Sequence, residues 1–176
     1  MKTEFELRIL EVNKDKIINH LEKLGAKKIG EFDQKRYVYN LNPKQENKWI
    51  RLRTNGKKTT LTYKDITSNT IDGTKEVEIE VNNFEKTNEL LEKIGFKNKG
   101  YQENKRIQYI LNDVEIDIDT WPLIPTYMEI EGKSEEEVIN ISKLLNVDET
   151  KITTLNCSDI YKNIYGIDIS KIQILK

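Results

Sequence analysis

The sequence predicts an α+β fold in which eight antiparallel strands close into a β-barrel and the helices pack outside it. Charged and apolar residues alternate along most of the predicted strands, which places the charged side chains on one face of the sheet. A pattern of strand, helix, strand and strand also occurs twice along the chain. An open sheet would have to solvate the charged face, whereas closure brings the charged faces together and removes the exposed strand edges.

Length and composition fit a single domain over residues 1–176, which is long enough to bury a sizeable core. The 29 basic and 30 acidic residues give a net charge of −1, which argues against a general nucleic-acid partner, so any anion site has to be local. The single cysteine, Cys157, excludes an intrachain disulfide and a cysteine-cluster zinc site, and we expect it to pack.

Hydropathy gives no sign of a membrane partner. No apolar run approaches the roughly 20 residues that cross a bilayer, and the N-terminal residues do not form an apolar signal segment. We therefore expect a cytoplasmic protein, present as a monomer or a homodimer.

The first half of the chain contains one predicted helix and four predicted strands. Asn13 can cap the helix, apolar residues follow at helical spacing, and Gly25 can end it. Asn55-Gly56 favours a tight hairpin turn between two strands. The predicted elements are a strand at 4–8, a helix at 13–24, strands at 35–41, 49–53 and 59–64, and polar loops at 42–48 and 65–74.

The second half repeats features of the first. Leu91-Glu92-Lys93-Ile94-Gly95 matches Leu21-Glu22-Lys23-Leu24-Gly25, and Lys105-Arg106 matches Lys35-Arg36 at the same offset. This repeat implies two halves related by a pseudo-two-fold axis, each unable to bury its apolar strand face alone. The predicted elements are strands at 76–81, 105–111, 114–120 and 127–133, a helix ending near 145 that begins with the capping box of Ser134 and Glu137, and a last helix at 158–165.

Several of these strands carry charges of one sign. Arg51 and Arg53 alternate with apolar residues on one strand, whereas the strands at 76–81 and 114–120 carry only acids at the equivalent spacing. A single strand of this kind is equally typical of a half-solvated sheet with a polar outer face. Repeated over the sheet, the pattern favours a wet lumen whose ligand has both phosphate-like and cation-like parts, because unpaired buried charges are unstable.

An ordered set of these residues resembles the CYTH domain of the triphosphate tunnel metalloenzyme superfamily, which includes class IV adenylate cyclases, thiamine triphosphatases and tripolyphosphatases. The resemblance covers nearly the whole chain and implies an eight-stranded antiparallel tunnel. The matching positions are Glu4, Glu6 and Arg8 of the N-terminal signature, Arg51 and Arg53, Lys64, the acidic strand 76–80, Arg106, Asp119, and Glu129 with Glu131.

The resemblance implies roles for these positions. Glu4, Glu6, Glu129 and Glu131 would bind Mg²⁺ or Mn²⁺, which prefer hard oxygen ligands. The bases would bind phosphate oxygens, and the arginines would do so with paired hydrogen bonds. Glu4, Glu6, Arg8, Lys64 and Arg106 form the predicted catalytic set. The predicted substrate-binding set is Arg8, Arg51, Arg53, Lys64, Arg106, Glu78, Glu80, Asp119 and Lys133.

Two positions depart from the family pattern. Arg8 stands where members usually have lysine, and a guanidinium is a very poor general base because it does not readily lose its proton. Asn104 stands where many members have lysine, and the neighbouring Lys105 falls on the opposite face of the strand. Both departures argue against a mechanism that requires a lysine base at these positions.

The predicted function is a metal-dependent hydrolase of a triphosphate such as tripolyphosphate, ATP or thiamine triphosphate. The alternatives are a class IV adenylate cyclase, which converts ATP to cyclic AMP and pyrophosphate, and a non-catalytic polyphosphate- or nucleotide-binding module. Cyclisation also needs an adenine pocket, for which no sequence signal is visible. The aromatic residues give none, because we expect Trp49, Trp121, Tyr37 and Tyr63 to pack beneath helices.

Overall fold

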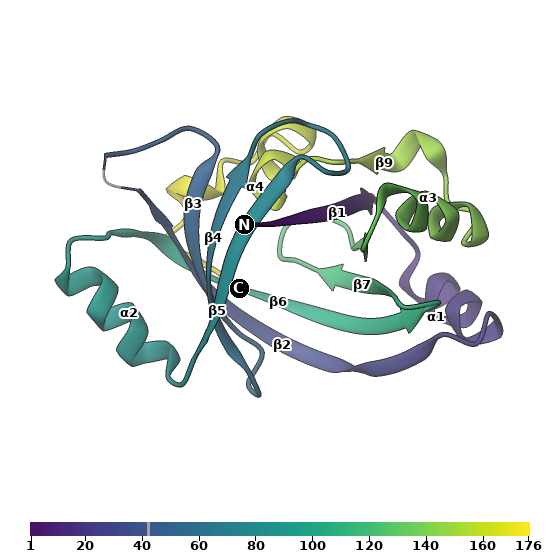
Figure 1. Ribbon diagram of the computed structural model, residues 1–176, viewed down its shortest axis with the longest axis horizontal. Helices are drawn as coiled ribbons and strands as arrows, with labels where there is room; N and C mark the ends of the chain where they lie inside the picture. The colour runs from purple at the N-terminus through teal and green to yellow at the C-terminus, as the bar shows by residue number, and fades with distance from the viewer. Residues whose placement is uncertain (42) are drawn as a thin grey trace.

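The computed structural model describes residues 1–41 and 43–176, in which eight strands close into an antiparallel barrel (Figure 1). Their hydrogen-bonded order is β1-β5-β4-β3-β2-β6-β7-β8, and β8 pairs back with β1. The predicted barrel is therefore confirmed. The strands are β1 (Lys2–Ile9), β2 (Lys27–Asn40), β3 (Lys48–Thr54), β4 (Thr59–Ile66), β5 (Thr74–Val81), β6 (Asn98–Leu111), β7 (Val114–Thr120) and β8 (Tyr127–Gly132).

Three ten-residue helices lie outside the barrel: α1 (Lys14–Lys23), α2 (Phe84–Lys93) and α3 (Glu135–Leu144). Their caps are Asn13, Asn83 and Ser134, each of which accepts a hydrogen bond from a backbone N–H of the first turn. Gly25 and Gly95 follow α1 and α2 with φ of 78° and 100°, a left-handed conformation that favours glycine. None of the helices in the described part of the chain is long and apolar enough to cross a membrane.

The strand register shows the predicted pseudo-two-fold symmetry. In the ladder between β2 and β6, Gln34 pairs with Asn104, and on either side Arg36 pairs with Gln102 and Phe32 with Arg106. The ladder is thus symmetric about the pair of Gln34 and Asn104, which relates Arg36 to Arg106. The ladder between β1 and β5 is likewise symmetric, about Thr3 and Lys75.

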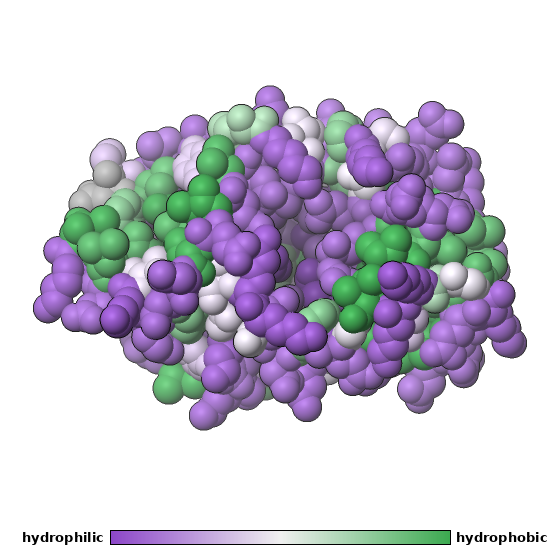
Figure 2. Space-filling view, turned by 60° about the horizontal axis from the view of Figure 1, so that its bottom comes forward, coloured by the Kyte–Doolittle hydropathy of each residue, from purple (hydrophilic) through white to green (hydrophobic). Residues whose placement is uncertain are grey.

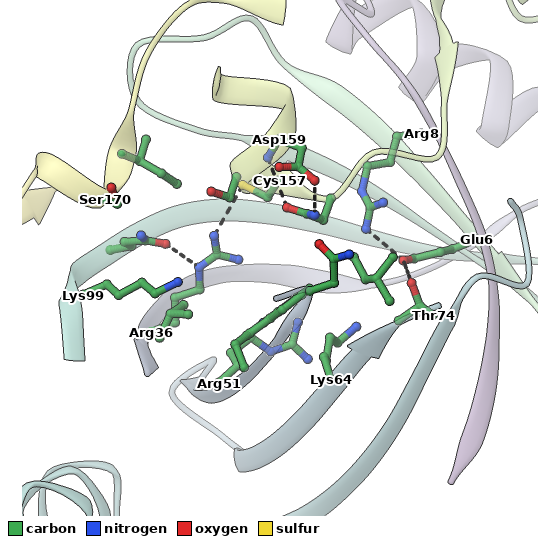
Figure 3. A pocket seen from close by; sticks show the side chains of 18 residues that line it. Glu6, Arg8, Arg36, Arg51, Lys64, Thr74, Lys99, Cys157, Asp159 and Ser170 are labelled. Carbon is green, nitrogen blue, oxygen red and sulfur yellow. Dashed lines mark hydrogen bonds and ion pairs between the residues drawn. The ribbon is translucent and has the colours of Figure 1, made fainter. Parts of the chain in front are cut away.

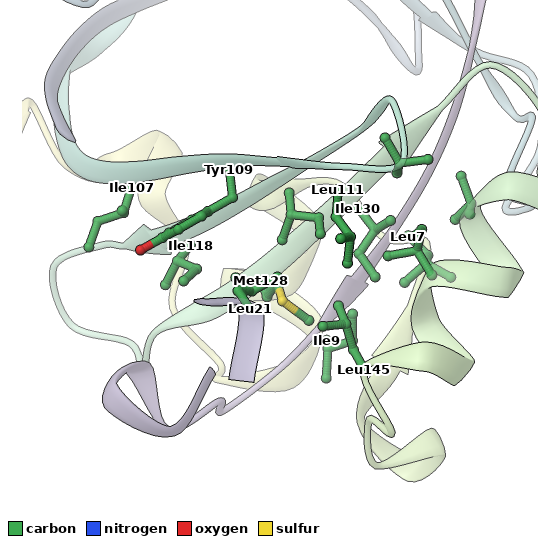
Figure 4. Packing of buried hydrophobic residues seen from close by; sticks show 14 residues of the cluster. Leu7, Ile9, Leu21, Ile107, Tyr109, Leu111, Ile118, Met128, Ile130 and Leu145 are labelled. Atoms are coloured by element: carbon green, nitrogen blue, oxygen red, sulfur yellow. The ribbon is translucent and has the colours of Figure 1, made fainter. Parts of the chain in front are cut away.

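The helix of each half packs against strands of the other half. Leu21 of α1 packs in one core cluster with Tyr109 of β6, whereas Leu91 of α2 packs in another with Tyr39 of β2. The helix of each half therefore covers apolar strand residues of the other half. The repeat predicted that neither half could bury this face alone, and the exchange of helices is how the structure achieves the burial. The α1 cluster is larger because α3 joins it, and Figure 4 shows its side chains filling the space between the sheet and these helices.

Both β2 and β6 run for 14 residues, twice the predicted lengths, so the predicted starts at 35 and 105 were wrong. The two strands pair along most of their length, and a register shift between Lys28 and Gly30 interrupts the alternation that marks a strand in the sequence. Asn42, part of the predicted loop 42–48, lies outside the described residues.

The C-terminal segment runs across one end of the barrel. The helix predicted at 158–165 is a helical segment over Cys157–Ile164, in which α4 (Cys157–Asp159) continues as a π-helical turn over Ile160–Ile164. Two unpredicted short strands flank this region: β9 (Ile152–Thr153) pairs with β1, and β10 (Ile174–Leu175) lies parallel to β6. Apolar residues of the segment pack with Leu10 and Trp121, which fixes it to the barrel.

Candidate active site

The inner strand faces enclose a tunnel that is open at two ends. The α4-side opening, about 210 Å³, lies between Trp49 of β3 and the segment 156–159. The opposite opening, about 370 Å³, is lined by Lys2 of β1 and Asn55 beyond the other end of β3. Arg51 lines both openings and the cavity between them, so its side chain borders all three spaces. Figure 2 shows a hollow ringed by hydrophilic residues in the face that it presents.

The central cavity brings together most of the predicted site. Alternation along each strand turns every second side chain inward, and closure of the barrel makes these side chains meet. The predicted residues that line this cavity are Glu4, Glu6, Arg8, Arg51, Arg53, Lys64, Arg106, Asp119, Glu129 and Glu131, and Glu78 lines the opposite opening.

Lys64 of β4 is held between an acid of the neighbouring β5 and an acid of β1, the next strand along the sheet. Its Nζ lies 2.6 Å from Glu4 Oε2 and 3.6 Å from Glu76 Oε2, and all three side chains are buried. Burial alone would raise the pKa of Glu4, but the charge and hydrogen bond of Lys64, together with Glu76 and Arg51, outweigh burial and lower the pKa. Glu4 is therefore ionised at neutral pH.

Arg8 of β1 bridges two carboxylates of the same region. Its Nη2 lies 2.9 Å from Glu6 Oε2 and 2.6 Å from Glu129 Oε2, and Arg8 stands opposite Glu129 in the β1–β8 ladder. Burial would lower the pKa of this guanidinium, yet Glu129 and Glu6 raise it well above its usual range. Arg8 is thus a fixed cation and cannot serve as a base.

Arg106 of β6 is neutralised by the strand beside it. Its Nη2 lies 2.6 Å from Asp119 Oδ2, its Nε donates to Asp119 Oδ1 at 2.8 Å, and its Nη1 contacts Asp117. Asn104 donates to the same Asp119 oxygen at 3.2 Å. The amide that replaces the family lysine therefore supports this acid–base cluster.

Arg51 and Arg53 of β3 are less compensated. Arg51 Nη2 lies 3.6 Å from Glu78 Oε2, and Arg53 forms no ion pair with any described residue. The neighbouring Arg51 charge, together with burial, lowers the pKa of Arg53 to about 10. This wall of the tunnel consequently carries positive charge that an anionic ligand can neutralise.

Among the carboxylates of these ion pairs, Glu131 is the least compensated, because its ion pair is with the exposed Lys2. Burial and the neighbouring Glu4 and Glu129 carboxylates raise its pKa to about 7, although Lys2 lies 3.2 Å away. Glu131 stands opposite Glu6 across the β1–β8 ladder. A divalent cation fits this donor set, because it would satisfy the like charges that repel one another here.

The carboxylates are turned toward bases in this structure. Among residues 1–41 and 43–176, no three acidic, histidine or cysteine side chains converge as a ready metal cluster. Glu4 binds Lys64, and Glu6 and Glu129 bind Arg8. Metal binding would therefore require some of these carboxylates to exchange partners.

Two residues of the predicted substrate-binding set lie away from the tunnel. Glu80 is exposed near the end of β5 and pairs with Lys58 at 3.7 Å. β8 ends at Gly132, and the backbone N–H of Lys133 donates to Glu137 at the start of α3. Neither residue lines one of the three tunnel spaces.

The tunnel also contains residues that the sequence analysis did not select. Arg36, Gln34 and Glu115 line the central cavity, and Asp117 binds Arg106. Arg36 is the two-fold counterpart of Arg106, so the repeat could have identified it. The other three could have been selected only for their position on inward-facing strands.

The aromatic residues divide between core and tunnel. Tyr37 stacks on Phe84 of α2 with ring centroids 5.3 Å apart, and Trp121 packs edge-on against Tyr161 of the C-terminal segment, as expected. The expectation for Trp49 was wrong, because it shares the inward parity of Arg51 and lines the α4-side opening. Cys157 lies at the same opening and accepts a hydrogen bond from Arg36 at 3.4 Å.

Comparison with known proteins agrees with this geometry. A model of the CYTH domain matches residues 2–156. The chain belongs to the CYTH domain family. A Methanocaldococcus jannaschii protein named as a candidate adenylate cyclase is 26% identical to this CYTH domain over 162 residues, which cover 85% of the chain and 93% of the relative.

Solved structures share the architecture. The PH1012 protein of Pyrococcus horikoshii superposes with a TM-score of 0.76 at 27% identity, covering 87% of this CYTH domain and 96% of that chain. A Hippeastrum protein described as a candidate adenylyl cyclase with a dominant triphosphatase activity gives a TM-score of 0.63 at 17% identity, covering 94% and 96%. The second likeness concerns the fold alone.

Proposed function

We propose that this CYTH domain is a metal-dependent hydrolase that binds a triphosphate in the tunnel. The observation that carries the proposal is the division of the lumen into two walls. Arg51 and Arg53 present incompletely neutralised positive charge on one side. On the other side Glu131 lies among acids and pairs with the exposed Lys2. A triphosphate with a divalent cation matches both walls at once.

The phosphate chain would be held by the bases that line the central cavity. Arg51 and Arg53 are the bases most available to phosphate oxygens, because few carboxylates pair with them. Arg8, Lys64 and Arg106 are already paired, so they hold their charges in fixed positions and can share hydrogen bonds with phosphate oxygens. Glu78 and Asp119 orient Arg51 and Arg106, respectively.

The metal would be Mg²⁺ or Mn²⁺, held by Glu4, Glu6, Glu129 and Glu131. When bound, it supplies a Lewis acid that neutralises charge on phosphoryl oxygens. The arginines stabilise the same charge, and a water molecule is the nucleophile of the in-line displacement. The chain offers no lysine base at position 8 or 104, so Arg8 acts by charge alone.

Adenylate cyclase activity is the second candidate. The α4-side opening includes Val38, Trp49 and Ile66 beside its charged residues, so an organic group can be accommodated next to the phosphate-binding wall. In that reaction the 3′-hydroxyl of ATP attacks the α-phosphorus and pyrophosphate leaves. The related candidate cyclase of M. jannaschii is consistent with this alternative.

Product analysis tests the proposal. The protein is incubated with tripolyphosphate, ATP or thiamine triphosphate, each with Mg²⁺, with Mn²⁺ and with a chelator. We expect phosphate release that the chelator abolishes. Cyclic AMP with pyrophosphate would establish the cyclase instead, and tight binding without turnover would indicate a binding module.

The variant Glu6→Gln tests whether the activity depends on the carboxylates of the tunnel. Gln keeps the side-chain shape but weakens a metal ligand, so we expect at least a tenfold loss of kcat with little change in the circular dichroism spectrum. Glu89→Gln, on the exposed side of α2, is the matched control. Unchanged turnover in folded Glu6→Gln protein would place the active site elsewhere.

A further inference from the structure

The α4-side opening contains two cations that lie outside the predicted substrate-binding set. Arg36 projects from β2 and Lys99 from the beginning of β6, and both line this opening (Figure 3). Neither forms an ion pair with a carboxylate of the described residues. By contrast, Arg8 and Lys64, which line the same space, are each paired with two carboxylates.

Arg36 is held in place by neutral groups. Its Nε donates to Gln102 Oε1 at 2.7 Å, its Nη2 donates to Cys157 Sγ at 3.4 Å, and its guanidinium carbon lies 4.2 Å from the centre of a Trp121 ring. Gln102 and Trp121 are both at least nine-tenths buried. These contacts fix the orientation of the guanidinium without neutralising it, which is the arrangement that a binding arginine needs.

One further observation agrees with an anionic partner for the two unpaired cations. Burial and the nearby Lys44 lower the pKa of Lys99, so its charged form is under-stabilised. An anion in this opening would neutralise two cations in a partly enclosed space, where charge pairing is stronger than in bulk water.

We infer that Arg36 and Lys99 form a separate subsite for a fourth phosphoryl group, so that the substrate class extends beyond simple triphosphates. The inference rests on the proposed function, because the other three phosphoryl groups occupy the central cavity. Arg36 and Arg51 line both spaces, so the subsite would adjoin the central cavity. The fourth group is either the next unit of an inorganic polyphosphate or a phosphate carried by an organic substituent. An organic substituent would also contact the apolar side chains of the opening. Titration with ligands of both kinds distinguishes the two sources.

Calorimetric titration of the full chain tests the subsite without requiring turnover. The probes are tripolyphosphate, linear tetrapolyphosphate, ATP and adenosine 5′-triphosphate 3′-phosphate, in the presence of Mg²⁺. We expect about tenfold tighter binding when the extra phosphate is present, the size of one charge-assisted contact. A gain for tetrapolyphosphate identifies the inorganic source, and a gain only for the 3′-phosphorylated nucleotide identifies the organic one.

Substitutions assign the gain to the two cations. Lys99 lines only the α4-side opening, so Lys99→Gln should remove most of the preference for the fourth phosphate while changing tripolyphosphate affinity by about twofold or less. Arg36→Gln should remove the same preference and also weaken tripolyphosphate binding, because Arg36 lines the central cavity as well. Arg36 packs on the Trp121 ring, so Arg36→Gln can disturb the fold. Lys99 does not make this contact, so Lys99→Gln keeps the test valid if the Arg36→Gln protein fails to fold. Lys105→Gln, an exposed charge on β6, is the matched control and should leave all affinities unchanged.

The outcomes separate this inference from the proposed function. Equal affinity for three- and four-phosphate ligands, or a preference that survives both substitutions, would overturn the subsite even if the protein hydrolyses tripolyphosphate. A preference that both substitutions remove would establish the subsite even if no ligand is turned over, and in that case the hydrolase assignment fails alone.

Discussion

Two symmetry-related arginines of the barrel have opposite surroundings. Arg36 stands opposite Arg53 in the β2–β3 ladder, whereas its counterpart Arg106 stands opposite Asp119 in the β6–β7 ladder. The backbone framework is the same in both halves, but β3 carries arginines where β7 carries aspartates. One half thus presents unpaired positive charge, and the other neutralises its own arginine.

This difference distinguishes arginines that bind ligand from arginines that stabilise the fold. A base with no carboxylate partner gains most from a ligand, because ligand binding supplies its first ion pair. A base that is buried among acids stabilises those acids in the folded protein, and removing it leaves uncompensated charges. We therefore expect substitutions on β3 to affect ligand binding and substitutions of Arg106 to affect folding.

The largest expected effect tests the acidic half. Arg106→Met removes the charge but keeps much of the volume, which leaves Asp117 and Asp119 buried without their cation. We expect a loss of about 3–5 kcal/mol in the free energy of unfolding, measured by urea denaturation at neutral pH. Arg53→Met is the matched control, because it removes an arginine without an acidic partner. Equal destabilisation by both variants would contradict the distinction between the two halves.

The next effect tests the basic half. Arg53→Gln should weaken triphosphate binding by about 2–3 kcal/mol, since a charge-assisted contact is lost. The variant should unfold at the same temperature as the wild type or higher, because Arg51 no longer faces a neighbouring charge that it repels. Calorimetric titration and thermal denaturation measure the two quantities. A loss of thermal stability with intact binding would reverse the assignment of Arg53.

The smallest effect concerns Glu131 in metal-free protein. Its pKa of about 7 lies above the usual value of 4.5, so its ionisation destabilises the fold increasingly as the pH rises from about 4.5 to 7. Glu131→Gln should therefore raise the free energy of unfolding by about 1–3 kcal/mol at pH 8, and the gain should vanish near pH 4.

Metal provides the control for this prediction. Saturating Mg²⁺ should stabilise the wild type more than Glu131→Gln, because the ion binds the charged carboxylate in the folded state. Thermal melts at pH 4 and pH 8, with Mg²⁺ and with chelator, measure both effects. A variant that is less stable than the wild type in chelator at pH 8 would show that Lys2 outweighs the surrounding acids.

The sequence by itself determined the features that depend on local spacing. Alternation of charged and apolar residues identified the inward faces of β1, β3 and β8, because successive strand side chains point to opposite sides. Capping residues such as Asn13 and Ser134 located the helices, because a cap satisfies backbone donors of its own first turn. The internal repeat predicted the two halves and their shared core.

Only the tertiary structure decided which charges meet. The sequence contains Arg53 and Arg106 as equally plausible phosphate ligands, but pairing with Asp119 depends on which strand lies beside each and in what register. The same applies to Trp49 and Arg36, which meet the C-terminal segment at one opening. Register between distant strands and the path of a connecting segment depend on non-local packing, which no local pattern specifies.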